Sequence, residues 1–131
     1  KMIETNLYSA YHLTRILLPG MIKRKSGHIF NMCSIASFAA YSNGGSYSIS
    51  KFALAGFSRN LREELKPYKI KVTAVYPGAT YTDSWKQSGL SEARFMKPDD
   101  IASVIFTAST LSPQACIEEL VIRPIEGDIR D

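Results

Sequence analysis

The sequence predicts an α/β fold built on a parallel sheet, because helical and strand-like segments alternate along the chain. Apolar residues recur at steps of three and four from Met2 to about Lys25 and again from about Ser46 to Lys66, which is the spacing of amphipathic helices. Short β-branched runs, bounded by glycine and proline, separate these helices. Strands alternating with helices of more than about ten residues are typical of βαβ units, so we expect a doubly wound parallel sheet.

The remaining elements complete an order of helix-strand-helix-strand-helix-strand. Three short runs are expected to be strands because they are rich in strand-forming residues: His28–Cys33, Ile70–Tyr76 and Glu119–Arg123. Pro98 and the acids after it open a third helix that runs to about Leu111, since proline and acids suit a first helical turn. The polar stretch from Thr80 to Lys97 is expected to be a long functional loop or lid, with a short helix near 83–87.

Two helix-breaking residues fall inside the predicted helices. Pro19 is expected to kink the first helix or to end its regular part, because it has no backbone N–H to donate. Gly56 costs about 1 kcal/mol relative to alanine in a helix interior. We therefore expect a close packing partner that requires its small size.

The composition is that of a globular protein and argues against several classes of function. Of the 131 residues, 45% are hydrophobic and 21% are charged. These proportions are typical of folded proteins, so we do not expect disorder over most of the chain. The net charge of +4 fits an anionic ligand such as a dinucleotide, but the basic residues do not cluster, so we expect no nucleic acid partner. We also expect no membrane partner, since no run approaches about 18 apolar residues. No signal peptide is expected either, because an amphipathic helical pattern and no apolar segment follows Lys1, and the expected location is cytoplasmic.

The cysteines and histidines do not indicate a metal site. Cys33 and Cys116 lie in apolar stretches without metal-ligand spacing, so both are expected to be small buried side chains in a reducing compartment. His12 and His28 have no partner at ligand spacing and are expected to be structural. We therefore expect no metal.

A tyrosine and a lysine four residues apart open the second predicted helix. Tyr47 and Lys51 therefore lie on one helical face. An ammonium group beside a tyrosine favours tyrosinate and so lowers the phenol pKa from about 10. Such a tyrosine can exchange a proton with a carbonyl or alcohol oxygen. Taken alone, the spacing is also that of an ordinary exposed pair.

Hydroxyl groups follow two of the predicted strands, at the edge where open α/β sheets bind ligands. Ser34 comes just after the first strand and can hydrogen-bond a substrate oxygen on which charge develops. Pro77 and Gly78 end the second strand in a turn that lets the backbone approach a ligand. The hydroxyls of Thr80 and Thr82 are then expected in the same crevice. Each motif alone is also compatible with a plain strand-ending turn.

Together these residues resemble the short-chain dehydrogenase/reductase family. The stretch 27–34 is similar to the family's strand that ends in the catalytic serine, 46–51 to its Tyr-x-x-x-Lys box, and 76–82 to its nicotinamide-contacting turn. Asn6 matches the asparagine of the family's preceding helix, and 97–102 resembles the opening of its penultimate helix. The resemblance covers essentially the whole chain, in order and with the expected gaps, and implies a partial Rossmann-like sheet.

The resemblance implies four catalytic residues. Tyr47 would be the acid–base, Lys51 would lower the pKa of that tyrosine, and Ser34 would hold the substrate oxygen. Asn6 would hold a water that links Lys51 to solvent, although a helix asparagine can equally bond the backbone. The implied substrate is a small carbonyl or alcohol compound whose identity these residues do not indicate.

The resemblance also implies a nicotinamide cofactor, NADP or NAD, with NADP favoured. Its binding residues would be Tyr47, Lys51, Pro77, Gly78, Thr80 and Thr82. The family's glycine-rich phosphate loop and the residue that separates NAD from NADP have no counterpart in the sequence. The helical pattern is already running at Met2 without a capping residue. We therefore expect residues 1–131 to be the C-terminal catalytic half of a single NAD(P)-binding domain, inactive by itself.

Three functions remain open at this point. The first is a catalytic fragment of a carbonyl reductase or alcohol dehydrogenase, and the second is a non-catalytic member that uses the fold for binding. The third is a self-associating structural module, since the two long amphipathic helices resemble the family's four-helix dimer interface; a homodimer or homotetramer is expected. Trp85, Phe95 and Met96 would either line a substrate pocket or anchor the core.

Overall fold

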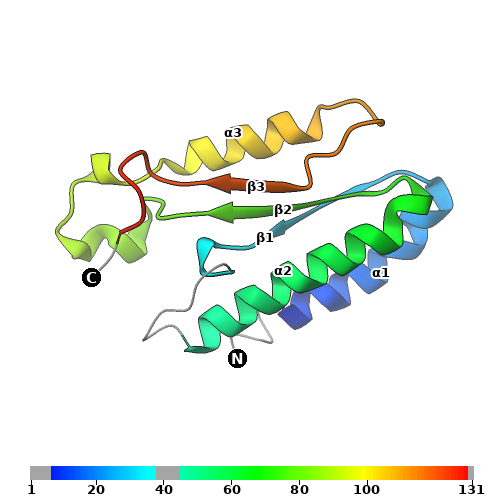
Figure 1. The fold of residues 1–131 in the computed structure, drawn as a ribbon, viewed down its shortest axis with the longest axis horizontal. Helices are drawn as coiled ribbons and strands as arrows, with labels where there is room; N and C mark the ends of the chain where they lie inside the picture. Colours follow the sequence, from blue (N-terminus) through cyan, green and yellow to red (C-terminus); the bar gives the residue numbers. More distant parts are fainter. Residues whose placement is uncertain (1–6, 38–44, 130–131) are drawn as a thin grey trace.

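Three parallel strands with helices on both faces make up the fold (Figure 1). A computed structural model describes residues 7–37 and 45–129 of the chain. The helices and strands are α1 (Ser9–Arg24), β1 (His28–Met32), α2 (Gly45–Leu65), β2 (Lys71–Pro77), α3 (Pro98–Ser109) and β3 (Glu119–Ile122). The strands lie in the order β1-β2-β3, so the predicted alternating α/β architecture is confirmed. The predicted start of the first helix at Met2 lies outside the described residues, and the other boundaries differ from the predicted ones by one or two residues.

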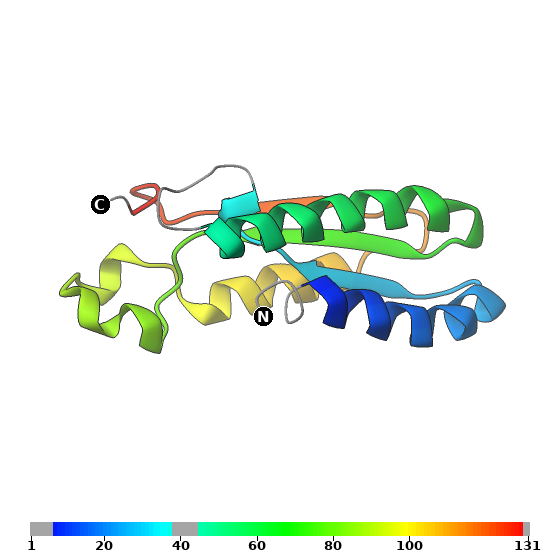
Figure 2. The same cartoon turned by 90° about the horizontal axis from the view of Figure 1, so that it is seen from below.

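β2 is the central strand, and its alternate residues form the two halves of the core. Val72 and Ala74 are fully buried against α2, whereas Val75 packs with Ile101 of α3 on the other face. Figure 2 shows α2 and α3 on opposite sides of the strands. Because helices cover both faces, β2 is buried without interruption from residue 72 to residue 76.

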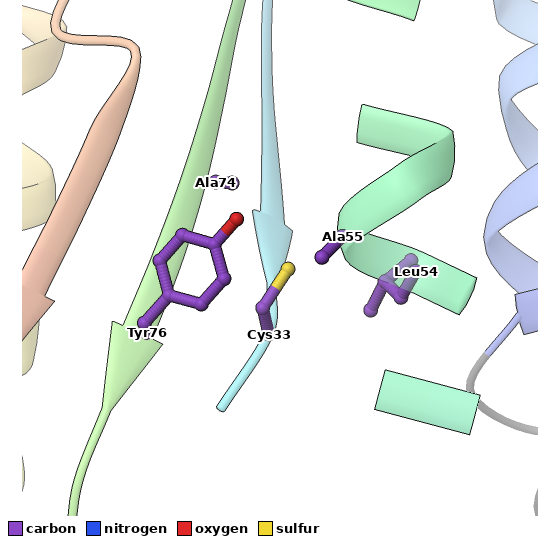
Figure 3. Close-up of a cluster of buried hydrophobic side chains, with 5 residues drawn as sticks. All are labelled: Cys33, Leu54, Ala55, Ala74 and Tyr76. Carbon is purple, nitrogen blue, oxygen red and sulfur yellow. The ribbon is translucent and has the colours of Figure 1, made fainter. Parts of the chain in front are cut away.

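A small cluster at the end of β1 holds α2 against the sheet. Cys33 lies between the ring of Tyr76 from β2 and the α2 residues Leu54 and Ala55, with Ala74 completing the contact (Figure 3). All five side chains are at most 4% exposed. Because α2 begins at Gly45, this packing also fixes where its first turn lies over the carboxyl ends of the strands.

α1 is the least embedded helix of the described chain, since none of its residues is buried. It touches α2 through the rings of Tyr11 and Phe57, whose centroids are 5.9 Å apart. The helix passes through Pro19 and ends at Arg24, followed by Lys25 in the left-handed conformation. Pro19 therefore does not end the helix.

Two expectations about small residues are wrong. A Cβ atom on Gly56 would meet no atom within 4 Å, so this exposed position has no close packing partner. Cys116 is exposed because its apolar stretch precedes the short edge strand β3 rather than entering the core, whereas the predicted burial of Cys33 is confirmed. The predicted short helix in the lid is also confirmed, as a 3₁₀ helix at Asp83–Ser88.

Over residues 7–37 and 45–129, none of the helices has the length and apolarity needed to cross a membrane.

Candidate active site

The carboxyl ends of all three strands point to the same edge of the sheet, at the left of Figure 1. The first turn of α2 and the lid segment lie at this edge as well. A cavity of about 520 Å³ opens there. Its lining includes six residues that the sequence nominated: Ser34, Tyr47, Pro77, Gly78, Thr80 and Thr82. Residues that are up to 48 positions apart in the sequence thus share one cavity, at the place where open α/β sheets bind ligands.

Ser34 is held at this edge by the end of β1. The preceding residue, Cys33, continues the ladder by donating its backbone N–H to the Val75 carbonyl at 2.7 Å. The Ser34 carbonyl then accepts from the Ser37 N–H at 2.8 Å, which turns the chain into a 3₁₀ helix at Ile35–Ser37. These backbone bonds leave the Ser34 side chain in the wall of the cavity, half-buried.

Tyr47 and Lys51 lie together on the first turns of α2, as their spacing predicts. The Lys51 ammonium is 5.7 Å from the centroid of the Tyr47 ring. It also donates a 2.9 Å hydrogen bond to the Met32 carbonyl, so it ties α2 to the last residue of β1. Tyr47 is 38% exposed and lines the cavity, where its ring meets the same space as Ser34.

Lys51 itself does not line this cavity. Its side chain lines a second, largely apolar cavity of about 450 Å³, which lies between α1 and β1. The structure therefore brings Ser34, Tyr47 and the strand-end turn into one space and sets Lys51 directly behind Tyr47. Asn6, the fourth nominated catalytic residue, lies outside the described residues.

The turn after β2 needs a glycine for a reason that the sequence does not reveal. A Cβ atom on Gly78 would lie 3.2 Å from Cδ of Pro124 and 3.5 Å from Cα of Arg123. The Gly78 N–H donates to the Ile122 carbonyl at 2.8 Å, which accounts for this closeness. Gly78 is therefore small because the chain after β3 packs against it. The sequence had suggested a different reason, the close approach of a ligand.

The two threonines of the cavity are partnered locally. The Thr80 hydroxyl donates to the Gly78 carbonyl at 3.1 Å. The Thr82 and Ser84 hydroxyls are 2.9 Å apart. Both threonine side chains therefore have a defined position in the cavity wall and retain acceptor capacity for a ligand.

The three lid residues for which two roles were considered lie in different places. Trp85 lines the cavity, with its ring centroid 5.3 Å from that of Phe95. Phe95 and Met96 are each 7% exposed, and Met96 joins the core cluster beneath α3. Phe95 thus packs against Trp85, and the lid is attached to the core through Met96 near its end.

Sequence reasoning missed the contribution of the C-terminal segment. Ile129 lines the cavity together with Ser34 and Tyr47, although it is distant from them in the sequence and belongs to no periodic pattern. The only usable signal was Gly127, which adopts a φ of +90° and so reverses the chain after β3. Among residues 7–37 and 45–129, no group of three His, Cys, Asp or Glu side chains has an arrangement that could hold a metal ion.

The sequence matches the model of the short chain dehydrogenase family over residues 1–93, so the chain belongs to this family. It is 35% identical over 130 residues to sepiapterin reductase of Chlorobaculum tepidum, a match that covers 98% of this chain and 53% of that protein. An oxidoreductase of Staphylococcus aureus strain N315 is 29% identical over 124 residues, covering 95% of this chain and 54% of that protein. The chain spans about half the length of the curated relatives it matches.

Solved structures agree with this assignment and with the Rossmann-type fold. Serine dehydrogenase complexed with NADP⁺, in its closed form, aligns with a TM-score of 0.86 at 28% identity, covering 98% of this chain and 56% of that one. A metagenomic short-chain oxidoreductase in complex with NADP aligns with a TM-score of 0.76 at 33% identity, covering 93% of this chain and 49% of that one.

Proposed function

We propose that residues 1–131 form the C-terminal catalytic half of a single NAD(P)-binding domain, whose enzyme transfers hydride between the cofactor and a carbonyl or alcohol substrate. The observation that carries this proposal is the shared cavity, in which the Ser34 and Tyr47 side chains face one space while the Lys51 ammonium stands behind Tyr47. Membership of the short chain dehydrogenase family supports it. This chain covers about half the length of each similar protein, which supports the proposal that it is one half of a domain.

In this proposal Tyr47 gives a proton to the carbonyl oxygen during reduction and takes one from the alcohol during oxidation. Ser34 donates a hydrogen bond to the same oxygen, on which negative charge develops as hydride reaches the carbon. Lys51 supplies a positive charge beside the Tyr47 ring. Asn6 is assigned to the relay that returns protons from solvent to Lys51.

The cavity suits the nicotinamide end of a cofactor, and NADP is favoured over NAD because two of the similar structures hold NADP. Thr80, Thr82 and the Pro77-Gly78 turn would form the wall for the nicotinamide, and Lys51 would reach its ribose. The neutral hydroxyls of Thr80 and Thr82 suit the nicotinamide amide and the ribose, because both of these groups offer hydrogen-bond donors and acceptors. When bound, the cofactor supplies or accepts the hydride at C4 of its nicotinamide.

This half is proposed to be inactive alone, because the sequence contains no glycine-rich loop for the cofactor phosphates. Titration of the 131-residue chain with NADPH and NADH, followed by calorimetry, tests this point. We expect no tight binding of either nucleotide. Tight binding would show that the phosphates are held by groups of this chain, and hydride transfer would then be assayed on the chain directly.

The catalytic assignment is tested by Tyr47→Phe in the complete enzyme. The phenyl ring keeps the packing of the first turn of α2 but has no proton to exchange, so turnover of every carbonyl substrate should be abolished while the unfolding temperature is unchanged. Tyr68→Phe, which removes an exposed hydroxyl outside the cavity, is the matched control and should be fully active. Normal turnover by Tyr47→Phe, or no turnover by the wild type in a broad carbonyl panel, would favour a non-catalytic binding role instead.

A further inference from the structure

The C-terminal turn closes one side of the candidate active-site cavity. After β3, the Gly127 N–H donates to the Pro124 carbonyl at 2.9 Å, and Gly127 adopts a φ of +90°. Nε of Arg123 lies 3.1 Å from Oδ1 of Asp128, which braces the turn from its other side. The chain is thereby folded back so that Ile129 lines the cavity and is half-buried there.

An arginine of the lid fastens this turn. Arg94 donates from Nη1 to the Gly127 carbonyl at 2.8 Å and from Nη2 to the Asp128 carbonyl at 3.2 Å. A guanidinium that grips two successive carbonyls fixes both the position and the direction of the backbone. The residue that follows them is Ile129, so Arg94 determines where this side chain meets the cavity.

The lining of this cavity includes three large apolar side chains, those of Ile35, Trp85 and Ile129. The ring of Phe95 packs against Trp85, with the two ring centroids 5.3 Å apart. Among the described residues, no side chain that lines this cavity is charged. Arg94 and Arg123 border a neighbouring cavity instead of this one, where Arg94 bonds two backbone carbonyls and Arg123 bonds Asp128.

A charged substrate would enter this cavity at a cost. An ionised carboxylate that leaves water without a partner of opposite charge loses several kcal/mol of hydration free energy. An alkyl or aryl group loses nothing comparable and gains by covering Trp85 and Ile129. The polar side-chain groups of the lining include neutral hydroxyls, which can meet a carbonyl oxygen but cannot balance the charge of a carboxylate. These hydroxyls belong to Ser34, Tyr47, Thr80 and Thr82.

We propose that this cavity selects uncharged carbonyl compounds with an apolar substituent, with Trp85 and Ile129 as specificity-determining residues and Arg94 as the residue that positions Ile129. The proposal rests on the function proposed above, because it names the substrate class of the same site. It distinguishes this chain from an enzyme for amino acids or keto acids, whose substrates carry a carboxylate into the site.

The single tryptophan of the chain gives a direct binding assay, because Trp85 is in the cavity wall. The test compares 2-octanone with 7-oxooctanoate, which have the same eight carbons and the same methyl ketone but differ in a terminal carboxylate. Each is titrated against the chain while Trp85 fluorescence is recorded. We expect 2-octanone to bind at least about tenfold more tightly than 7-oxooctanoate. Equal affinities, or no fluorescence response to either ketone, would overturn the proposal.

Variants of the C-terminal turn sharpen the test. Ile129→Arg places a cation in the wall, so 7-oxooctanoate should now bind more tightly than 2-octanone. Ile125→Arg is the matched control, because Ile125 belongs to the same turn but is fully exposed and outside this cavity. Its preference should equal that of the wild type. An unchanged preference in Ile129→Arg, with a normal unfolding temperature, would remove Ile129 from the cavity wall.

The role of Arg94 is tested by Arg94→Leu and Arg94→Lys. Loss of both donor nitrogens in Arg94→Leu should free the turn and reduce the preference for 2-octanone to about twofold or less. Arg94→Lys keeps a single donor nitrogen, which can still bond one of the two carbonyls, and should retain part of the preference. A merely structural role would lower the unfolding temperature without changing the ratio of the two affinities, and this result would refute the positioning role.

The substrate class and the proposed function can fail separately. If fluorescence discriminates the ketones but Tyr47→Phe leaves turnover of the complete enzyme intact, the specificity stands and the catalytic assignment is wrong. If turnover depends on Tyr47 but both ketones bind equally, the catalytic assignment stands and the specificity is wrong.

Discussion

The hydroxyl of Tyr76 donates a 2.8 Å hydrogen bond to Oε1 of Glu119, and this bond joins the central strand β2 to the edge strand β3. Tyr76 is fully buried, whereas the Glu119 side chain is 37% exposed. The same carboxylate oxygen accepts from Arg59 of α2 at 3.1 Å. One partly exposed carboxylate thus connects two strands with the helix that carries Tyr47 and Lys51.

The Tyr76–Glu119 bond should contribute measurably to stability. Tyr76→Phe preserves the buried ring but leaves the carboxylate with Arg59 alone, so we expect the free energy of unfolding in urea to fall by about 1 kcal/mol. The loss stays moderate because water reaches Glu119. Tyr68→Phe removes a hydroxyl that is 40% exposed and should change stability by a negligible amount. An equal effect of the two substitutions would mean that the buried bond adds nothing beyond hydration.

The same contact raises the pKa of Tyr76 and lowers the pKa of Glu119, which keeps the tyrosine neutral and the glutamate ionised. Burial raises the pKa of Tyr76, and the hydrogen bond to Glu119 adds to this effect. For Glu119, burial alone would raise the pKa, but the hydrogen bonds from Tyr76 and Arg59 outweigh it and hold the pKa below its ordinary value. A carboxylate with a lowered pKa in the folded state contributes stability that is lost as the pH falls through that lowered pKa.

His28 is expected to make stability depend on pH in a higher range. The Thr73 hydroxyl, 2.7 Å from Nε2 of His28, donates its single hydrogen to the Ile117 carbonyl, so the imidazole is the donor to Thr73. Burial and the positive charge of Lys71 lower the pKa of His28 from its ordinary value of 6.5. The unfolded chain therefore takes up the proton first, and the stability present above about pH 6.5 is lost as the pH falls below it.

Urea unfolding at several pH values between about 5 and 8 measures this slope. His28→Gln should be less stable at pH 8 yet lose less stability on acidification than the wild type. His12→Gln, which changes an exposed histidine of α1, should keep the wild-type slope. A slope that persists in His28→Gln would assign the titration to another group.

Local patterns were sufficient for the elements of this fold. Proline and acids placed the start of α3 at Pro98, and the β-branched run placed β2 to within one residue. The grouping of the candidate site residues was accessible as well, because parallel strands bring Ser34 and the turn after Pro77 to one edge whatever their separation in the sequence. The periodicity of a segment and the topology of a parallel sheet are both properties that a sequence expresses directly.

Long-range contacts within irregular segments were not accessible in this way. The hydrogen bond from Arg94 to the Gly127 carbonyl joins two loops. Neither loop has a regular spacing of apolar residues from which this contact could be predicted. The exposure of Cys116 depends on β3 being a short edge strand, which its apolar sequence does not reveal. The glycine at 56 suggested a close contact, but whether a helix face meets a neighbour depends on how the helices are arranged around the sheet.

The two thiols should differ strongly in reactivity. Burial raises the pKa of Cys33 to about 11, whereas Cys116 is exposed. Because the thiolate is the reactive form, iodoacetamide at about pH 8 should label Cys116 rapidly and Cys33 only after unfolding. Peptide mass spectrometry distinguishes the two sites. In Cys116→Ser the folded chain should show no rapid labelling, and labelling of Cys33 at the rate of Cys116 in the wild type would contradict its burial.

The exposed face of α1 should cause the chain to self-associate as a homodimer or homotetramer. Leu13, Ile16 and Leu17 are 58%, 74% and 50% exposed, and none of the residues of α1 is buried within the chain. Such an apolar surface is removed from water when a second copy covers it. Sedimentation at micromolar concentration should therefore give a mass above that of the monomer.

Ile16→Glu should shift the chain towards monomer, whereas Phe106→Glu, at a 70% exposed position of α3, should leave the mass unchanged. A monomeric wild type, or equal effects of both substitutions, would rule out α1 as the interface.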